Sequence, residues 1–278
     1  MPVALRAHRG QSVRVSDAQD LRALTADDAP WMADVMVERR AVYAAMSPVF
    51  WRPAANARQV HEPHLASCVA NERYVGIGTG RGFVLGELQA AGSPPWWPEA
   101  PLGFVDDFAV VADDAWMSDG RRLLLAAWSL LRERGAEALR VVTARRDDAK
   151  VAMLESLGLT IGESWWVRAG DASVSGAPAF GPISAYGIEA LVIPAPPVYD
   201  PGGPVLLVTA LVSPNDVGTV PQLAAEHGAV LAIVPGKPTT PEMAEAARAA
   251  GFDETSRYYV GQPGASYGDD FGAVVSST

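Results

Sequence analysis

Two adjacent aspartates, Asp106 and Asp107, lie at the centre of the segment GFVDDFAVV. The flanking residues are β-branched and aromatic, which predicts a short strand, and polar residues in mid-strand are typical of a strand that carries a site. Burial beside aromatics would raise the pKa of an aspartate and make it a proton acceptor near neutral pH. Because side chains alternate along a strand, we expect Asp106 on the face of Phe104 and Phe108, and Asp107 on the other face. The alternative is that one aspartate pairs with an arginine or caps a loop.

The turn after this strand, ADDAWMSDG, is a candidate anion site because it leads into the helix pattern RRLLLAAWSLLRERG. Ser118 and Gly120 permit close approach to the backbone, where the free N–H groups of a helix start attract anions. Asp119 adds an opposing charge, which Arg121 and Arg122 can offset. The alternative is an ordinary helix start with Ser118 or Asp119 as the N-cap residue.

His61 and His64, in the segment HEPH, have a spacing found among metal ligands. A proline lies between them, and no third ligand is near them in the sequence. Because such sites need at least three protein ligands, we expect no metal here.

These residues lie in an ordered series of predicted elements. The helix of residues 121–135 ends at Gly135, and it is followed by a strand (138–144), a helix (147–158) and a third strand (164–169). Strand–helix–strand order predicts a βαβ unit, whose ligands bind at the carboxyl end of the first strand.

The series resembles the acyl-CoA core of the GNAT acetyltransferase superfamily. The matching pieces are VDDFAVV, WMSDGRRLLLAAW, LRVVTA, and the helix DDAKVAMLESLGL with the aromatic strand after it. Upstream, VRVSDAQDLRALTADDAPWMADVMVERRAVYAAMSPVFWRP resembles the family's first strand and its two substrate-side helices, and ERYVGIG and GFVLGELQ its next two strands. The resemblance covers residues from about 12 to 168. It implies a mixed-sheet α/β fold and an N-acyltransferase that uses acetyl-CoA, another acyl-CoA or an acyl-pantetheine, without a metal.

The resemblance implies a donor site built mainly from backbone groups. The pantetheine arm would bond to the strand end like an added strand, and the turn would hold the pyrophosphate. The residues concerned are Val110, Val111, Met117, Ser118, Asp119, Gly120, Arg121 and Arg122. The family pattern Arg/Gln-x-x-Gly-x-Gly/Ala becomes Ala-Trp-Met-Ser-Asp-Gly here, so its leading residue and its first glycine are lost.

The resemblance also implies that a carboxylate on the fourth strand takes the proton from the acceptor ammonium, and Asp106 is the candidate. The family's general acid, a tyrosine, is replaced by Leu154, and the asparagine at the start of the same helix is replaced by Asp147. Tyr43 and Tyr74 are either substitutes for this acid or core residues.

A small-molecule amine is the expected acceptor, and its candidate contacts are Tyr43, Trp51, Arg52 and Trp97. Aromatic residues at helical spacing, such as Tyr43, usually belong to the core. Two prolines bracket the turn that presents Trp51 and Arg52, and Trp97 lies in the proline-rich loop GSPPWWPEAPL. These two loops are expected to form a lid.

The second part of the chain is predicted to repeat the first. We expect a GNAT domain at residues 1–170, a linker at 171–182 and a partial, non-catalytic GNAT-like half-domain at 183–278. The segments GPVLLVTALV, VPQLAAEHGA, LAIVP, PEMAEAARAAGF and SRYYV repeat the strand–helix–strand–helix–strand order of residues 103–168. Their turn has no basic residue, so this copy is expected to extend the sheet or cover an edge.

Composition excludes several classes of function. Residues 171–278 hold three of the 22 basic residues and 11 of the 32 acidic ones, and the net charge of −10 disfavours general nucleic-acid binding. A single cysteine, Cys68, excludes an internal disulfide. No stretch approaches the roughly 20 apolar residues of a membrane span, and the start lacks a signal pattern, so we expect a cytoplasmic protein.

Two hypotheses follow. In the first, the protein is an N-acyltransferase with Asp106 as base, and its altered turn and missing acid indicate an unusual donor such as an acyl carrier protein. In the second, it is a non-catalytic tandem GNAT-like protein that binds a ligand or scaffolds a partner. A monomer and a homodimer are equally compatible with the sequence.

Overall fold

The computed structural model of the protein describes residues 21–92, 100–170, 180–237 and 240–263. The strands are β1 (Arg22–Ala23), β2 (Tyr74–Thr79), β3 (Gly82–Gln89), β4 (Leu102–Val110), β5 (Ala138–Ala144), β6 (Thr160–Ala169), β7 (Gly181–Ala185), β8 (Ile188–Ile193), β9 (Val205–Leu211), β10 (Leu231–Gly236) and β11 (Asp253–Gly261). The α-helices are α1 (Ala29–Met46), α2 (Ala57–Val69), α3 (Arg121–Glu133), α4 (Asp148–Ser156), α5 (Val220–Glu226) and α6 (Pro241–Ala249). The element types predicted between residues 72 and 169 are confirmed, and the mixed α/β class with them.

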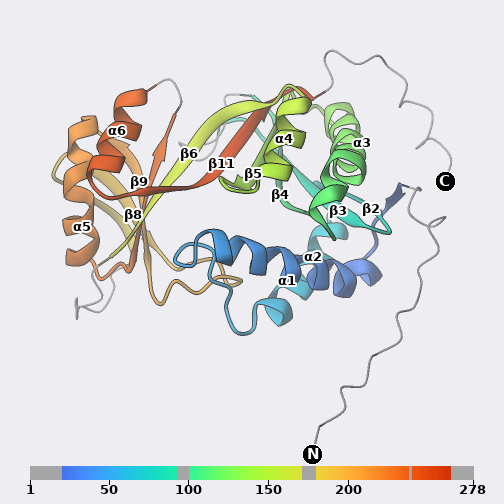
Figure 1. Ribbon diagram of the computed structural model, residues 1–278, viewed down its shortest axis with the longest axis horizontal. Coiled ribbons are helices and arrows are strands. Elements are labelled where there is room, and N and C mark those ends of the chain that lie inside the picture. The colour runs from blue at the N-terminus through green and yellow to red at the C-terminus, as the bar shows by residue number, and fades with distance from the viewer. Residues whose placement is uncertain (1–20, 93–99, 171–179, 238–239, 264–278) are drawn as a thin grey trace, which may run out of the picture.

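All described strands form one mixed sheet in the order β1-β2-β3-β4-β5-β11-β6-β10-β9-β8-β7. Only the pairs β4–β5 and β9–β10 are parallel, and the other described neighbours are antiparallel. Figure 1 shows β6 and β11 as long strands across the middle of the molecule, between the N-terminal half with α3 and α4 and the C-terminal half with α5 and α6.

Apart from the edge strand β1, the strand order is the same when counted from either edge. Strands β2 to β5 are followed by β11, and β7 to β10 are followed by β6. Each half therefore places one strand next to the other half's parallel pair. The helices after β4, β5, β9 and β10 each lead to a glycine with positive φ, namely Gly135, Gly158, Gly228 and Gly251. The predicted repeat thus appears in the topology, but as one shared sheet.

The predicted linker, residues 171–182, ends inside a strand, because β7 begins at Gly181. Residues 171–179 lie outside the described part of the chain, as do Trp97 and the start, up to residue 20, of the segment that resembles the family's first strand. No described helix has the length and apolar character needed to cross a membrane.

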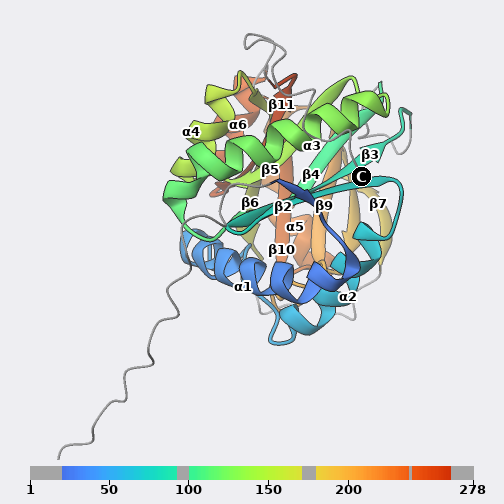
Figure 2. The ribbon, with the colours of Figure 1, turned by 90° about the vertical axis from the view of Figure 1, so that its right-hand side faces the viewer.

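Helix α3 packs on the sheet through its apolar face, which buries Leu123, Leu124, Ala127, Trp128 and Leu131. Glycines in the sheet make room for it, because a Cβ at Gly86 or Gly103 would lie 2.8 or 2.9 Å from the Leu131 Cδ1. Figure 2 shows α3 across one face of the sheet, with α1 and α2 across the other.

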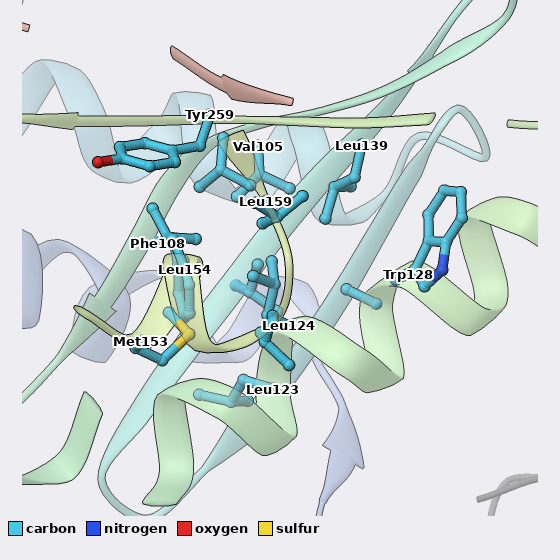
Figure 3. Packing of buried hydrophobic residues seen from close by; sticks show 14 of the residues in the cluster. Val105, Phe108, Leu123, Leu124, Trp128, Leu139, Met153, Leu154, Leu159 and Tyr259 are labelled. Carbon is cyan, nitrogen blue, oxygen red and sulfur yellow. The ribbon is translucent and has the colours of Figure 1, made fainter. Parts of the chain in front are cut away.

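Strand β11 contributes to the core of the N-terminal half. Tyr259 is fully buried in a cluster that includes Val105, Leu124 and Leu154 (Figure 3). Its hydroxyl donates a hydrogen bond of 3.0 Å to the Glu155 carboxylate. The last strand of the chain is therefore part of the structure that supports β4 and β5.

Replacement of Tyr259 by alanine should destabilise the whole protein, because it leaves a cavity between β11 and α4. We expect Tyr259→Ala to lower the free energy of unfolding by about 3 to 5 kcal/mol and Tyr259→Phe by about 1 kcal/mol. Val212 is 86% exposed, and Val212→Ala should stay within about 0.5 kcal/mol of the parent. Urea unfolding followed by tryptophan fluorescence measures these differences. A Tyr259→Ala protein as stable as Val212→Ala would contradict the described place of β11.

Candidate ligand site at the end of strand β4

A cavity of about 290 Å³ lies beside β4, on the face of the sheet that α1 and α2 cover. Its lining comes from both halves of the chain: Met36, Arg39, Arg40, Tyr43, Trp51, Val60, His61, His64, Asp106, Asp107, Phe108, Val142, Lys150, Pro196, Pro197, Val198 and Tyr199. We call this space the central cavity. Its volume suits a small organic molecule.

A β-bulge in β4 turns both aspartates into the central cavity. Val84 of β3 faces Phe108, whereas Gly86 faces Val105, so two residues of β4 stand opposite one residue of β3. The extra residue reverses the alternation of side chains after it. Our expectation that Asp106 and Asp107 lie on opposite faces is therefore wrong, and Phe108 packs in the α3-side cluster together with Val105.

Asp106 is the open carboxylate of the cavity. Its side chain is exposed to solvent there and makes no hydrogen bond or ion pair with any described residue. Loss of hydration next to the surrounding protein and the negative charge of Asp107 raise the pKa of Asp106 to about 6, although Lys150, His61 and Arg40 act to lower it. The group is therefore mostly ionised at pH 7 and can accept a proton or bind a cation.

Asp107 is held in its ionised form by a buried chain of side chains. Arg40 Nη2 lies 2.6 Å from His61 Nδ1, and His61 Nε2 lies 3.1 Å from Asp107 Oδ1. A guanidinium can only donate, so Nδ1 accepts and the ring proton lies on Nε2, from which it is donated to Asp107. Burial acts to raise the pKa of Asp107, but the hydrogen bond from His61 and the charge of Arg40 lower it below its usual value.

The same side chains bring three possible metal ligands together. Atoms of His61, His64 and Asp107 lie within 4.8 Å of one another, so our statement that no third ligand is near the histidines is wrong in three dimensions. Metal binding through His61 Nε2 would require the ring proton on Nδ1, where it would point at the Arg40 guanidinium. The tautomer that Arg40 imposes thus opposes a metal at this cluster.

A second set of buried charges closes the cavity near α4. Arg39 forms ion pairs with Asp147 and Asp113, and the Tyr43 hydroxyl donates to Asp147 at 3.0 Å. Lys150 Nζ lies 2.9 Å from the Val142 carbonyl and 3.4 Å from the Phe108 carbonyl. Burial lowers the pKa of Lys150 to about 8, partly offset by Asp147.

Lys150 occupies the gap where β4 and β5 separate. The two strands pair only from Leu102 to Val105, and beyond this point the Lys150 ammonium spans their carbonyls and lies over the rings of Phe108 and Trp116. An extended ligand placed between the two strands, as the resemblance implies for pantetheine, would have to displace this side chain.

The predicted phosphate turn has a helical conformation. Residues 113–120 form a 3-10 helix, η3 (Asp113–Ala115), and a π-helix, η4 (Trp116–Gly120), directly before α3. Trp116 is fully buried, and a Cβ at Gly120 would lie 2.7 Å from its Cε3. The glycine therefore makes room for the indole ring, which is a packing reason for its presence.

The other predicted donor residues lie away from the central cavity. Asp119 is buried and lies 3.4 Å from Arg81 Nη1, and Met117 is exposed. The Ser118 hydroxyl bonds to a backbone carbonyl, and Arg121 bonds to Ser156. The other residues assigned to the donor, Val110, Val111 and Arg122, are likewise absent from the cavity lining. The Val111 amide donates to the Arg81 carbonyl at 2.9 Å, so this N–H already has a partner.

Of the predicted acceptor residues, Tyr43 and Trp51 line the cavity and Arg52 does not. Arg52 instead donates to the carbonyl of Asp200 in the C-terminal half. Trp97 lies outside the described residues. Leu154 is buried in the core cluster, which agrees with the expectation that it cannot act as an acid.

Sequence reasoning did not assign Arg39, Arg40 or Lys150 to the site, nor the segment 196–199. The two arginines lie in mid-helix of α1 and are almost fully buried. Charged residues at buried helical positions are the signal that could have identified them. The contribution of residues 196–199 had no local signal, because it depends on contact between the two halves.

The two aspartates should have opposite effects on stability. A pKa raised above the usual value means that ionisation of Asp106 disfavours the folded state, with a cost that is absent below the usual pKa of 3.8, grows as the pH rises and is complete above about pH 6. Asp106→Asn should therefore raise the melting temperature at pH 8 and raise it less at pH 4.5. Asp107 has a lowered pKa, so its ionised form stabilises the fold at neutral pH, and Asp107→Asn should lower the melting temperature at pH 8. Scanning calorimetry at several pH values measures both, and shifts of the same sign at pH 8 would refute the assignment.

Comparison with known proteins finds similarity in structure only. No family model and no curated protein matches the sequence. An acetyltransferase candidate from Pyrococcus horikoshii is 10% identical over 92% of this chain and 93% of its own, with a TM-score of 0.49. The PaiA N-acetyltransferase of Thermoplasma acidophilum, in complex with coenzyme A, is 13% identical over 55% of this chain and 93% of its own, with a TM-score of 0.39. An aminoglycoside acetyltransferase from an uncultured soil metagenomic sample, in complex with sisomicin, is 18% identical over 51% and 89%, with a TM-score of 0.35.

At these identities and TM-scores the similarity carries no argument about activity. The order of elements from β1 to β6 and the separation of β4 from β5 are features of this chain itself, and they agree with the resemblance in the sequence. The protein has a mixed α/β fold built on one shared sheet, and its order of elements agrees with the resemblance to the GNAT superfamily found in the sequence.

Proposed function

We propose that the protein binds a small organic amine in the central cavity, with the ammonium group at Asp106. The observation that carries this proposal is the bulge in β4, because it turns Asp106 and Asp107 into the cavity together, where Asp106 is a carboxylate without a described partner. An ionised, unpaired carboxylate next to a hydrophobic wall binds a ligand cation through charge-assisted hydrogen bonds.

The pairing of the other charges supports an amine rather than an anion. Arg39 is neutralised by Asp147 and Asp113, and Arg40 is directed at His61 and through it at Asp107. The Nε and Nη1 atoms of Arg40 have no hydrogen-bond partner among the described residues, but both are closed off from solvent in this conformation. Asp106 is the charged group that stays open to a ligand.

A second candidate is acyl transfer to this amine from a CoA or pantetheine-carrier thioester, with Asp106 as the proton acceptor. It is favoured by one specific feature, the separation of β4 and β5 beside the amine site. Attack on a thioester needs the free amine, and a carboxylate with a pKa of about 6 within reach of the ammonium can take its proton.

The donor side argues for binding without transfer. Lys150 and Trp116 fill the space between β4 and α4, and the turn before α3 is helical. Because the Lys150 ammonium lies between the carbonyls of β4 and β5, we expect acyl transfer to require movement of this side chain. For this reason we place amine binding before catalysis.

Amine binding should depend on Asp106 and on its ionisation. We expect isothermal titration to detect small primary amines, and Asp106→Asn to weaken their binding about tenfold or more, because a charge-assisted contact is lost. Affinity should also fall as the pH drops below about 6, where Asp106 takes up a proton. The exposed Asp253, on β11 outside the cavity, supplies the control variant Asp253→Asn. Equal affinities of Asp106→Asn and the parent would refute the role of Asp106.

Binding of a thioester by the protein can be tested directly. We expect acetyl-CoA not to bind the wild-type protein, and Lys150→Ala to bind it more tightly because the gap between β4 and β5 is then open. The exposed Lys237 provides the control Lys237→Ala. Binding of acetyl-CoA by the wild type, followed by thiol release when an amine is added, would establish the second candidate instead.

A further inference from the structure

The connection between β8 and β9 gives the C-terminal half a place in the central cavity. This segment, PAPPVYDPGGP (residues 194–204), contains five prolines, so its backbone has little freedom. Four of its residues, Pro196 to Tyr199, line the cavity. Nothing in the sequence led us to expect a contribution from this segment to the site.

Backbone hydrogen bonds attach this segment to the turn that carries Trp51. The amide of Ala54 donates to the carbonyl of Val198 at 3.0 Å, and the amide of Asp200 donates to the carbonyl of Arg52 at 2.9 Å. Pro53 and Tyr199 form an antiparallel bridge between these two contacts. The two segments thus behave as a short ribbon that joins the halves at the rim of the cavity.

Aromatic rings of the ribbon contact one another and a ring of α1. The ring of Tyr199 lies 5.3 Å from the ring of Trp51, and Trp51 lies 5.2 Å from Tyr43. Tyr199 and Asp106 line the same cavity. A ligand whose ammonium group contacts Asp106 therefore meets Tyr199 and Trp51 with its apolar part.

We propose that Tyr199, from the C-terminal half, determines which amines the cavity accepts, and that it selects amines with a short apolar or aromatic body. This proposal rests on the proposed function, since it extends amine binding to a substrate class. Aromatic rings attract both apolar groups and organic cations, and a cavity of about 290 Å³ restricts the body to a small one. The C-terminal half is then part of the binding site as well as of the sheet.

The test compares two amines on the full-length protein. The probes are methylamine, which has almost no apolar body, and 2-phenylethylamine. Tyr199→Leu removes the ring and keeps an apolar side chain, whereas Tyr199→Phe keeps the ring. The exposed Phe180 of the same half, which is absent from the cavity lining, supplies the control Phe180→Leu. Isothermal titration measures the affinity of each protein for both amines, and circular dichroism establishes that each variant is folded.

We expect the wild type to prefer 2-phenylethylamine. Tyr199→Leu should reduce that preference about fivefold, the loss expected for one aromatic contact, while Tyr199→Phe and Phe180→Leu keep it. An unchanged preference in Tyr199→Leu overturns this inference and leaves amine binding intact. If Asp106-dependent binding is absent for both amines in the wild type, the proposed function fails and this inference fails with it.

Discussion

The rest of the structure depends on the positions of β6 and β11, because each of these strands pairs with strands of the other half. Each of these strands is hydrogen-bonded to the other and to the last strand of the opposite half's parallel pair. Without β11, strand β5 would present an unpaired edge, and without β6 the same would hold for β10. Tyr259 adds a side-chain component, because it fills the core under α4. Neither half completes its own sheet, so the two repeats form one cooperative structure.

The central cavity follows from this arrangement. The shared sheet brings the β8–β9 connection against the turn after α1, and the bulge in β4 adds two carboxylates to the space between them. Most of the charge there is compensated internally, by the Arg39–Asp147 pair and by the chain from Arg40 through His61 to Asp107. Buried charges of this kind are costly without partners, and the partners leave Asp106 as the group that a ligand can use.

The residues expected to bind the donor have structural roles in this chain. The positions that the resemblance assigns to the pyrophosphate serve packing in this chain, since Gly120 makes room for Trp116. Lys150 uses its ammonium to join the carbonyls of β4 and β5 where the strands part. Both residues satisfy requirements of the folded protein without a ligand, so similarity of fold does not establish a thioester site here.

Local sequence pattern by itself determined the types and approximate ends of the elements from β2 to β6. These features depend on periodicity, turn residues and short-range spacing, which a linear sequence contains. The resemblance in the sequence led to Asp106, Tyr43 and Trp51, which line the central cavity. Only the tertiary structure decided four other features. They are the bulge that places Asp107 beside Asp106, the proximity of Asp107 to the two histidines, the pairing of β6 and β11 with strands of the other half, and the position of Tyr199 in the cavity lining. Each depends on strand register or on contacts between residues more than 40 positions apart, and local propensity carries no information about either.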